Sequence, residues 1–554
     1  MKRFSAIFMA LVMLFSFAAC TGSNDGEKSG KTHEYTTGYD KTKYNAPGVF
    51  PIFKEKQTIT VTAPDNAKVE DFETNAQTLM YEEQLNADLV FTILPSKEYT
   101  TKLNLMAAAG GDEFTDVIIN SSFSDGMVMN LAEAEVIVPL TEYFYNTDIA
   151  WNLQEAKSRL DWDFYPYITM TDGEIYGPPV INDSPSNCNS AKLWVYEPWF
   201  DAAGIELSSI KTTEDFKNAM LAVVKSDPNG NGKADEVGLT AYATTHSWQD
   251  WLMNAFIYSG EDNYIYVKDG KLGFAYTQEE WREGLRYIKE LYDLGLIDPL
   301  AFSQDSTGYK AMLNYEDTIV TAFVGTQASN VAENDPRRVE YTAIAPLNSS
   351  WNDGKPLSSQ TLPEPKSALL VTLNAEDPEV GFRLGDLMVS EESSIHTRWG
   401  VKGKDWLVPD EDDVALYAVL GYKPTLVEVL PYGAVQNSHW NGIGPWIRQK
   451  SIAAGTVWSG NPLDTNVKIA EAQMLYNDTN PEEDIVKLIY TEEENEIISA
   501  GLANCKTYAD QAAAQFVTGT LDLDKDWDAY IKQLDAMNVA GVLECAQAAY
   551  DRMK

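Results

Sequence analysis

Strands and helices alternate in the early part of the chain, and this order limits the possible folds more than any other sequence feature. Gln57–Ala63 (QTITVTA), Asp88–Leu94 (DLVFTIL) and Thr115–Asn120 (TDVIIN) have the apolar, β-branched character of strands, and segments with helical spacing separate them. This order predicts a parallel sheet with right-handed crossovers. Ligands of such sheets bind beyond the carboxyl ends of the strands, so Asn66 and Asn120 are candidate ligand-binding residues.

The N-terminus has the features of an export signal. Lys2 and Arg3 precede an apolar run, Phe4–Ala19, that is too short and wrongly flanked for a membrane span. Residues 1–19 are therefore predicted to form a signal peptide. The tetrad FAAC, which ends at Cys20, resembles a bacterial lipobox, and this implies cleavage before Cys20 and a lipid anchor on its thiol. An ordinary secretory signal is the alternative.

The segment after the signal predicts a tether. Residues 20–50 are polar and rich in Gly, Ser and Thr, so they cannot bury a core. A flexible chain of this length would hold a folded body close to its anchor. We therefore expect the protein at the cell membrane, lipid-anchored on the extracytoplasmic face.

Length, charge and cysteine content limit the size and the partners of that body. The 554 residues are enough for two sizeable lobes. The chain has 83 acidic and 42 basic residues, a formal net charge of −41, which argues against nucleic acid as a partner. Beyond Cys20 the cysteines are Cys188, Cys505 and Cys545; this odd, sparse set predicts free thiols, with a Cys505–Cys545 bridge as the alternative.

The segment SDPNGNGKADEVG holds oxygen donors spaced as in a calcium-binding loop. Counted from Asp227, side-chain oxygens fall at positions 1, 3, 5 and 9, a glycine at position 6 and a main-chain carbonyl at position 7. Position 12 is Gly238 rather than Glu, so a carboxylate at position 10 would have to replace it. The predicted ligands of a structural calcium ion (Ca2+) are Asp227, Asn229, Asn231, Lys233, Asp235 and Glu236. The alternative is a solvated turn without metal.

The chain lacks the common catalytic signatures. It has four histidines and no H-E-x-x-H, G-x-S-x-G or P-loop motif. A carboxylate pair for glycoside hydrolysis stays open among the 83 acidic residues, although no local pattern singles out a pair. We therefore expect a protein that is not an enzyme.

Two short segments combine aromatic side chains with amides and histidine. Gln436–Ser451 (QNSHWNGIGPWIRQKS) and Thr245–Trp251 (THSWQDW) offer flat apolar rings beside hydrogen-bonding groups, a combination that suits the faces and hydroxyls of sugars. Core packing is the alternative for each tryptophan. The predicted ligand-binding residues are Asn66, Asn120, Tyr196, Trp248, Gln327, His439, Trp440 and Trp446.

Several longer segments resemble one family of transport proteins and occur in the order typical of that family. These segments are KLNLMAAAGGDEFTDVI, LWVYEPWFDAAGIELSSIKTTEDFKNAMLAVVKSDPNGNGKADE, KELYDLGLIDPLAF and AAQFVTGTLDLDKDWDAYIKQLD. The chain resembles a large lipid-anchored extracellular solute-binding protein, of the family 1 type, that serves a carbohydrate ABC importer and is related to the alginate-binding proteins. The resemblance covers nearly the whole chain beyond the signal peptide.

The resemblance implies an α/β fold of the periplasmic-binding-protein type II, with two α/β lobes joined by hinge strands around a ligand cleft. We assign residues 51–182 and 320–374 to the first lobe and residues 183–319 and 375–554 to the second. The resemblance also implies a monomer that captures an oligosaccharide by hinge closure and delivers it to permease subunits in the membrane. For the Asp227 loop it implies bound calcium.

The chemistry near the second-lobe opening favours a neutral sugar. The family often has a basic residue within the segment WVYEPW, where this chain has Tyr196 and Glu197. A site for uronic acids would use arginine for bidentate contacts, although other arginines such as Arg448 could serve. The remaining alternatives are a surface glycan-binding lipoprotein outside an ABC system and a secreted glycoside hydrolase.

Overall fold

The computed structural model describes residues 33–553 except 161, 244–246, 261–263, 327–329, 333, 353, 432, 459, 460, 462 and 486. The predicted signal peptide, Cys20 and the first part of the tether lie outside the described residues. In the part that is described, no helix combines the length and the apolar character needed to cross a membrane.

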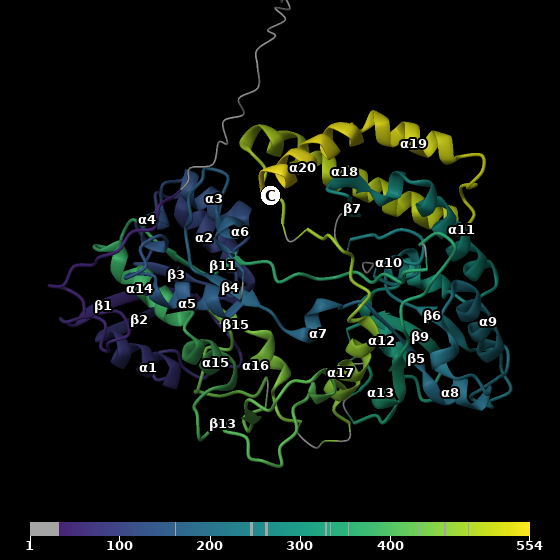
Figure 1. Cartoon of the computed structure of the whole chain (residues 1–554), viewed down its shortest axis with the longest axis horizontal. Coiled ribbons are helices and arrows are strands. Elements are labelled where there is room, and N and C mark those ends of the chain that lie inside the picture. The colour runs from purple at the N-terminus through teal and green to yellow at the C-terminus, as the bar shows by residue number, and fades with distance from the viewer. Residues whose placement is uncertain are drawn as a thin grey trace, which may run out of the picture. The chain divides into compact units, whose positions relative to one another are not determined.

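A four-stranded sheet forms the centre of the first lobe, and three of its strands confirm the predicted parallel pairing (Figure 1). β1 (Gln57–Pro64) pairs in parallel with β2 (Ala87–Leu94) and with β3 (Val117–Ile119). β12 (Leu369–Val371) joins the other edge of β3 in the antiparallel direction. β3 and β12 are buried along their whole length, as expected for short apolar strands with both faces covered.

The helices that pack on this sheet come from two separate parts of the chain. Most of these helices share one core with the strands, and this core also holds Trp440 and Ile447. Tyr99, Leu103, Met127 and Val128 pack instead in a second cluster on Ile118 and Leu370. The helices are α1 (Ala76–Leu85), α2 (Tyr99–Ala108), α3 (Asp125–Glu133), α4 (Thr141–Phe144), α5 (Trp151–Leu160), α6 (Tyr165–Ile168), α14 (Pro378–Met388) and α15 (Glu391–Trp399).

The second lobe has a sheet of mixed direction. β5 (Lys192–Tyr196) lies between β10 (Tyr341–Ala343) and β9 (Val320–Gly325), antiparallel to both, and β6 (Val237–Thr240) pairs with β9 in parallel. Around it lie α8 (Glu197–Ala202), α9 (Thr213–Val224), α10 (Ser247–Met253), α11 (Glu279–Asp293), α12 (Ser306–Leu313), α13 (Arg337–Glu340), α17 (Thr465–Tyr476) and the hairpin of β7 (Ile265–Lys268) and β8 (Lys271–Phe274).

Three C-terminal helices, α18 (Glu492–Val517), α19 (Trp527–Ala536) and α20 (Val539–Met553), extend the second lobe (Figure 1). α18 begins with a capping box between Thr491 and Glu494, which satisfies the first backbone N–H groups of this long helix. α18 packs against α11 and α20. Cys505 on α18 and Cys545 on α20 are free thiols in the structure, and so is Cys188.

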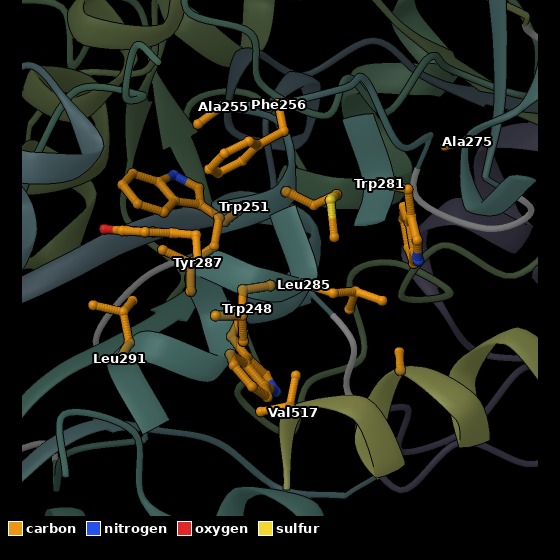
Figure 2. Packing of buried hydrophobic residues seen from close by; sticks show 14 of the residues in the cluster. Trp248, Trp251, Ala255, Phe256, Ala275, Trp281, Leu285, Tyr287, Leu291 and Val517 are labelled. Atoms are coloured by element: carbon orange, nitrogen blue, oxygen red, sulfur yellow. The ribbon is translucent and has the colours of Figure 1, made fainter. Parts of the chain in front are cut away.

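Several tryptophans lie in the core of the second lobe. Figure 2 shows Trp248 and Trp251 of α10 near Leu285, Tyr287 and other side chains of α11. α11 is strongly amphipathic, and its apolar face is the face that is buried. Trp248 is 2% exposed and meets the ring of Phe302 edge-on. The prediction that Trp248 binds a ligand is therefore wrong in this structure, because its indole is part of the core.

A third, small sheet carries the chain between the lobes. β4 (Pro179–Asn182) lies between β11 (Lys366–Ser367) and β15 (Trp446–Arg448), antiparallel to β11 and parallel to β15. The chain continues from β4 through α7 (Pro185–Cys188) into β5. The remaining elements of this region are β13 (Trp406–Leu407), β14 (Val427–Glu428) and α16 (Lys450–Ala454).

The strand pairing corrects the residue ranges that we assigned to the lobes. β9 begins at residue 320 and lies in the second sheet, so the second lobe continues to β10 instead of ending at residue 319. α14 and β15 lie in the first-lobe core and α15 packs against both, although residues 375–554 were assigned to the second lobe. The reason is physical. The apolar composition of a strand predicts that the strand is buried, but it does not predict which sheet the strand joins.

A buried carboxylate links two helices of the first lobe. Asp386 of α14 is 2% exposed and accepts hydrogen bonds from the backbone N of Asn152 (3.2 Å), the backbone N of Leu153 (3.0 Å) and Nδ2 of Asn152 (3.0 Å). These donors lie at the first turn of α5, where the helix dipole also favours negative charge. Burial raises the pKa of Asp386 to about 7 despite these bonds.

We predict that Asp386→Ala lowers the free energy of unfolding by about 3 kcal/mol, because it leaves several buried donors without an acceptor. Urea unfolding followed by circular dichroism measures this change. Asp386→Asn keeps one acceptor oxygen and should lie between the wild type and the alanine variant. Equal stability of Asp386→Ala and the wild type would contradict the capping role.

Candidate functional site

A cavity of about 460 Å³ lies where β4 and β15 pair, and residues of both lobes line it. The first lobe contributes the end of α15 and the residue after Asn120, and the second lobe contributes Asn466 of α17. The side chains used in the argument below are Ser121, Asn182, Arg398, Trp399, Glu428, Trp446 and Arg448. We call this space the smaller cavity.

Indole and guanidinium groups stack on one another along a wall of the smaller cavity. The guanidinium carbon of Arg448 lies 4.6 Å from the ring centre of Trp446 and 5.2 Å from that of Trp399. The guanidinium carbon of Arg398 lies 5.2 Å from the ring of Trp399. Such contacts are worth about 0.5–2 kcal/mol each, so they hold the two indoles in defined orientations. Nε1 of Trp446 also donates to the carbonyl of Gly442 at 3.1 Å.

A carboxylate completes this wall. Oε2 of Glu428 accepts from Nη2 of Arg398 at 3.4 Å and from Nε1 of Trp399 at 3.2 Å. The charge of Arg398 is therefore balanced within the wall, and the Trp399 indole is fixed by its N–H as well as by its ring. The arrangement offers one partly exposed ring, that of Trp446, beside charged and amide groups, while Trp399 is 3% exposed and supports Arg398 and Arg448 from within the wall.

A larger cavity of about 640 Å³ adjoins the smaller one, and the two share Asn182 and Ser184 in their linings. Lys487 in its wall lies 2.5 Å from Oδ2 of Asp125 and donates to the carbonyl of Tyr167 at 2.9 Å. Tyr258 in the same wall donates its hydroxyl to Oδ2 of Asp484 at 2.9 Å. The segment before α18 is thus tied to α3 and α6 of the first lobe.

Two residues of the segment 436–451 that were predicted to bind a ligand are buried instead. Trp440 has no exposed surface, packs edge-on against Tyr81 and Phe91, and donates Nε1 to Thr78 Oγ1 at 2.9 Å. The prediction of a ligand contact for Trp440 is wrong, because its ring and its N–H are both satisfied in the first-lobe core. His439 is 5% exposed, and its Nδ1 accepts from the backbone N of Asn441 at 3.0 Å.

Of the residues predicted to bind a ligand, the structure brings Trp446 to the smaller cavity. Asn120 lies next to it, but its amide bonds to Ser121 N and to the carbonyl of Ser122 in a local turn. Asn66 accepts from Lys68 N, and Tyr196 donates to Glu340 Oε2 at 2.7 Å; neither lines either cavity. Gln327 lies outside the described residues.

Sequence reasoning did not single out most of the cavity lining. Trp399 ends a helix and Glu428 lies in a two-residue strand, and neither stands in a recognisable motif. Asn182 is the last residue of the range 51–182 assigned to the first lobe, and this predicted boundary was the signal that could have identified it. These residues become a site because segments distant in sequence pair there.

The Asp227 loop is folded as a series of turns whose side-chain oxygens converge. Oδ1 of Asp227 and Oδ1 of Asn229 both accept from Asn231 N, at 3.1 and 3.0 Å, and Oδ1 of Asn231 accepts from Lys233 N at 2.8 Å. Asp235 accepts from the amides of Asn229 and Asn231 at 3.2 Å. Gly232 has φ = 75°, a conformation that favours glycine at this turn.

One carboxylate oxygen of this loop has no hydrogen-bond donor in the part of the chain that the structure describes. Oε1 of Glu236 is buried, and no described residue donates a hydrogen bond to it. Burial, with the charges of Asp227 and Asp235, raises the pKa of Glu236. Among the described residues, no three His, Cys, Asp or Glu side chains lie together closely enough to bind a metal by themselves, so amide and carbonyl oxygens would have to complete the set. The predicted donor set, which includes these oxygens, fits a hard dication.

The two-lobe fold with a polar, aromatic-lined cavity at the crossing strands defines a solute-binding protein. The chain belongs to the bacterial extracellular solute-binding protein family, whose model matches residues 60–394. The fold class and the resemblance described above are confirmed. Proteins of this family bind solutes, so the chain is a binding protein rather than an enzyme.

Two curated relatives extend the match to most of the chain. The fructooligosaccharide ABC transporter substrate-binding protein FusA of Streptococcus pneumoniae is 23% identical over 536 residues, which are 92% of this chain and 93% of FusA. The lipoprotein LipO of Bacillus subtilis is 25% identical over 365 residues, which are 64% of this chain and 68% of LipO.

Solved structures share the fold at low sequence identity. FusA in complex with kestose has a TM-score of 0.67 at 20% identity, with 90% of this chain and 99% of FusA covered. A second FusA structure is described as an EF-hand mutant in complex with fructo-nystose. The alginate-binding protein AlgQ2 without calcium ion has a TM-score of 0.61 at 18% identity, with 91% of this chain and 100% of AlgQ2 covered.

We predict that His439 makes the protein less stable as the pH falls from 6.5 to 4. Burial, followed by the charge of Arg398, lowers the pKa of His439 from 6.5 to about 4, so the unfolded chain binds a proton in this range that the folded chain does not. Stability is therefore present above pH 6.5 and lost toward pH 4. Thermal unfolding of the wild type and of His439→Gln, which cannot bind the proton, should diverge over this range; parallel curves would contradict the assignment.

Proposed function

We propose that this protein is the substrate-binding component of an ABC importer that captures an oligosaccharide between its two lobes. The observation that carries the proposal is the smaller cavity, where the partly exposed Trp446 indole meets several amide and charged groups at the crossing strands. Aromatic rings stack on the C–H faces of sugar rings, and the polar groups bind hydroxyls. The relative FusA, named as a substrate-binding protein for fructooligosaccharides, supports this class of ligand.

The charges around the cavities favour a neutral sugar. Arg398 is paired with Glu428, and the guanidinium of Arg448 lies against two indoles. The larger cavity has the carboxylates Asp125, Asp183, Glu364 and Asp484 in its lining against Lys366 and Lys487. An anionic sugar would meet this excess of negative charge in a protein that is itself strongly acidic.

We further propose a lipid anchor at Cys20 that holds a monomer at the outer face of the cell membrane, within reach of its permease. The sequence around Cys20 supports this, as does the naming of LipO as a lipoprotein. Residues of a single chain line both sides of the cavities, so a second copy is not required for binding. Closure of the lobes on a ligand would present a new surface to the permease.

For the Asp227 loop we propose a structural calcium ion bound by Asp227, Asn229, Asn231, Lys233, Asp235 and Glu236. The buried, unbonded oxygen of Glu236 supports this, because a cation would satisfy it. The amide of Asn229 donates to the carbonyl of Thr318 at 3.2 Å, just before β9, so the loop is joined to the second sheet. Calcium there would hold β9 in place rather than act as a switch.

We predict that an oligosaccharide raises the melting temperature of the mature protein and that Trp446→Ala removes most of this effect. A ligand at 100 times its dissociation constant adds about 2.7 kcal/mol to the free energy of unfolding. Loss of a central aromatic contact costs about 2 kcal/mol, or about 30-fold in affinity. Differential scanning fluorimetry with kestose, fructo-nystose, maltooligosaccharides and alginate oligomers identifies the sugar, and titration calorimetry gives the affinities.

Trp446→Phe keeps a flat ring and should bind more tightly than Trp446→Ala. Trp351→Ala is the matched control, because Trp351 is 43% exposed and lines neither cavity. A neutral series that binds while the alginate oligomers do not is the expected result. Absence of binding throughout the panel, or release of hydrolysis products from a bound sugar, would contradict the proposed function.

We predict that calcium raises the melting temperature and that Glu236→Gln weakens calcium binding about tenfold, because a neutral amide replaces a carboxylate ligand. Calcium titration calorimetry of chelator-treated protein measures the affinity, and unfolding with and without chelator measures the stabilisation. Glu206→Gln, in the same lobe but outside the loop, is the control and should bind calcium as the wild type does. Equal affinities of Glu236→Gln and the wild type would exclude Glu236 as a ligand.

A further inference from the structure

The smaller and the larger cavity meet at β4, and two residues in or just after this strand line both of them at the junction. Asn182 and Ser184 line both cavities and lie two residues apart on an extended segment, so their side chains are on the same side of the chain. Asn182 is aligned with Arg448 in the parallel pairing of β4 with β15. The junction is therefore formed by backbone pairing and does not depend on a mobile loop.

Asn182 also has an unmet hydrogen-bonding requirement. Its Oδ1 is buried, and no described residue donates to it. A buried amide oxygen without a donor is costly, and such groups in folded proteins are usually satisfied by water or by a ligand. Asn182 lines the space on both sides of the junction, so a hydroxyl of a ligand that passes from one cavity to the other could donate to it.

The two cavities differ in chemistry in a way that suits successive parts of one ligand. The smaller cavity has the partly exposed indole of Trp446, held by the guanidinium of Arg448, and such a ring suits a sugar ring lying flat. The larger cavity has Tyr258, Gln360 and Tyr490 with several carboxylates, which suit hydroxyl donors. Each volume lies within the range of ordinary ligand pockets, so each can hold part of an extended molecule.

We infer that one extended oligosaccharide chain occupies both cavities, with Asn182 accepting a hydroxyl at the junction, so that the protein selects for chain length as well as for sugar type. This inference rests on the proposed function, because it assumes a sugar in the smaller cavity. It goes further in naming the larger cavity as a second set of subsites and Asn182 as the residue between the two sets.

Two neighbouring serines allow each cavity to be blocked separately. Ser121 is exposed and lines the smaller cavity, and Ser122 is half-buried and lines the larger one. Both lie in the loop between β3 and α3, so tryptophan at either position is compatible with the same fold, and unfolding curves check this. Ser121→Trp and Ser122→Trp are therefore matched controls for each other.

The test is titration calorimetry of the wild type and both variants with a short and a long member of one series, kestose against fructo-nystose and maltotriose against maltopentaose. We expect the wild type to bind the longer member about tenfold more tightly. Ser122→Trp should bind both members with the affinity that the wild type has for the short one, and Ser121→Trp should bind neither. Affinity that is independent of length, or an equal loss for both lengths in Ser122→Trp, would overturn the inference.

The role of Asn182 is tested separately, by the sugar affinity and the melting temperature of an alanine variant. Asn182→Ala should weaken binding of the longer sugar about tenfold while the melting temperature of the free protein stays the same or rises, because a buried oxygen without a donor is removed. A lower melting temperature with unchanged affinity would show a structural role instead and overturn the assignment. If the wild type binds no sugar of either series or of the panel above, the proposed function fails and this inference fails with it; if sugars bind without length dependence, this inference alone fails.

Discussion

The parallel pairing of β15 with β4 is the constraint on which the site depends. β4 leads the chain out of the first lobe, and β15 returns to the same place much later in the sequence. Their register sets Trp446 beside Val180 and Arg448 beside Asn182. Without this pairing the indole wall would have no fixed position relative to the crossing strand, and the two cavities would have no common border.

The parts of the fold that depend on the local pattern of apolar residues could be predicted from the sequence. The alternation from Gln57 to Asn120 predicted the parallel direction of β1, β2 and β3, because short apolar strands joined by helices have few arrangements. Residues 320–374 were assigned to the first lobe, whereas Val320–Gly325 forms β9 of the second sheet. Its composition is that of any buried strand, and its partners β5 and β6 are specified by the packing of the whole lobe.

The residues of the candidate site could be predicted only in part, for a related reason. Tryptophan is both the best ring for stacking on a sugar and one of the best side chains for filling a core, so sequence alone does not separate the two uses. Trp440 and Trp446 lie six positions apart in one segment; the first is enclosed by Tyr81 and Phe91, and the second borders a cavity. Trp399, Glu428 and Asn182 share no motif, because a site built from distant segments leaves no local pattern.

The first lobe is discontinuous in sequence, and this has a consequence for how the chain reaches its native state. β12 closes an edge of β3, α14 supplies the carboxylate that caps α5, and β15 closes an edge of β4, yet all three are made long after the strands and helix they complete. Such non-local contacts form late, because long loops must close first. The N-terminal part of the chain therefore stays incomplete during synthesis. For a member of an extracellular family, this delay would favour passage across the membrane before folding is finished.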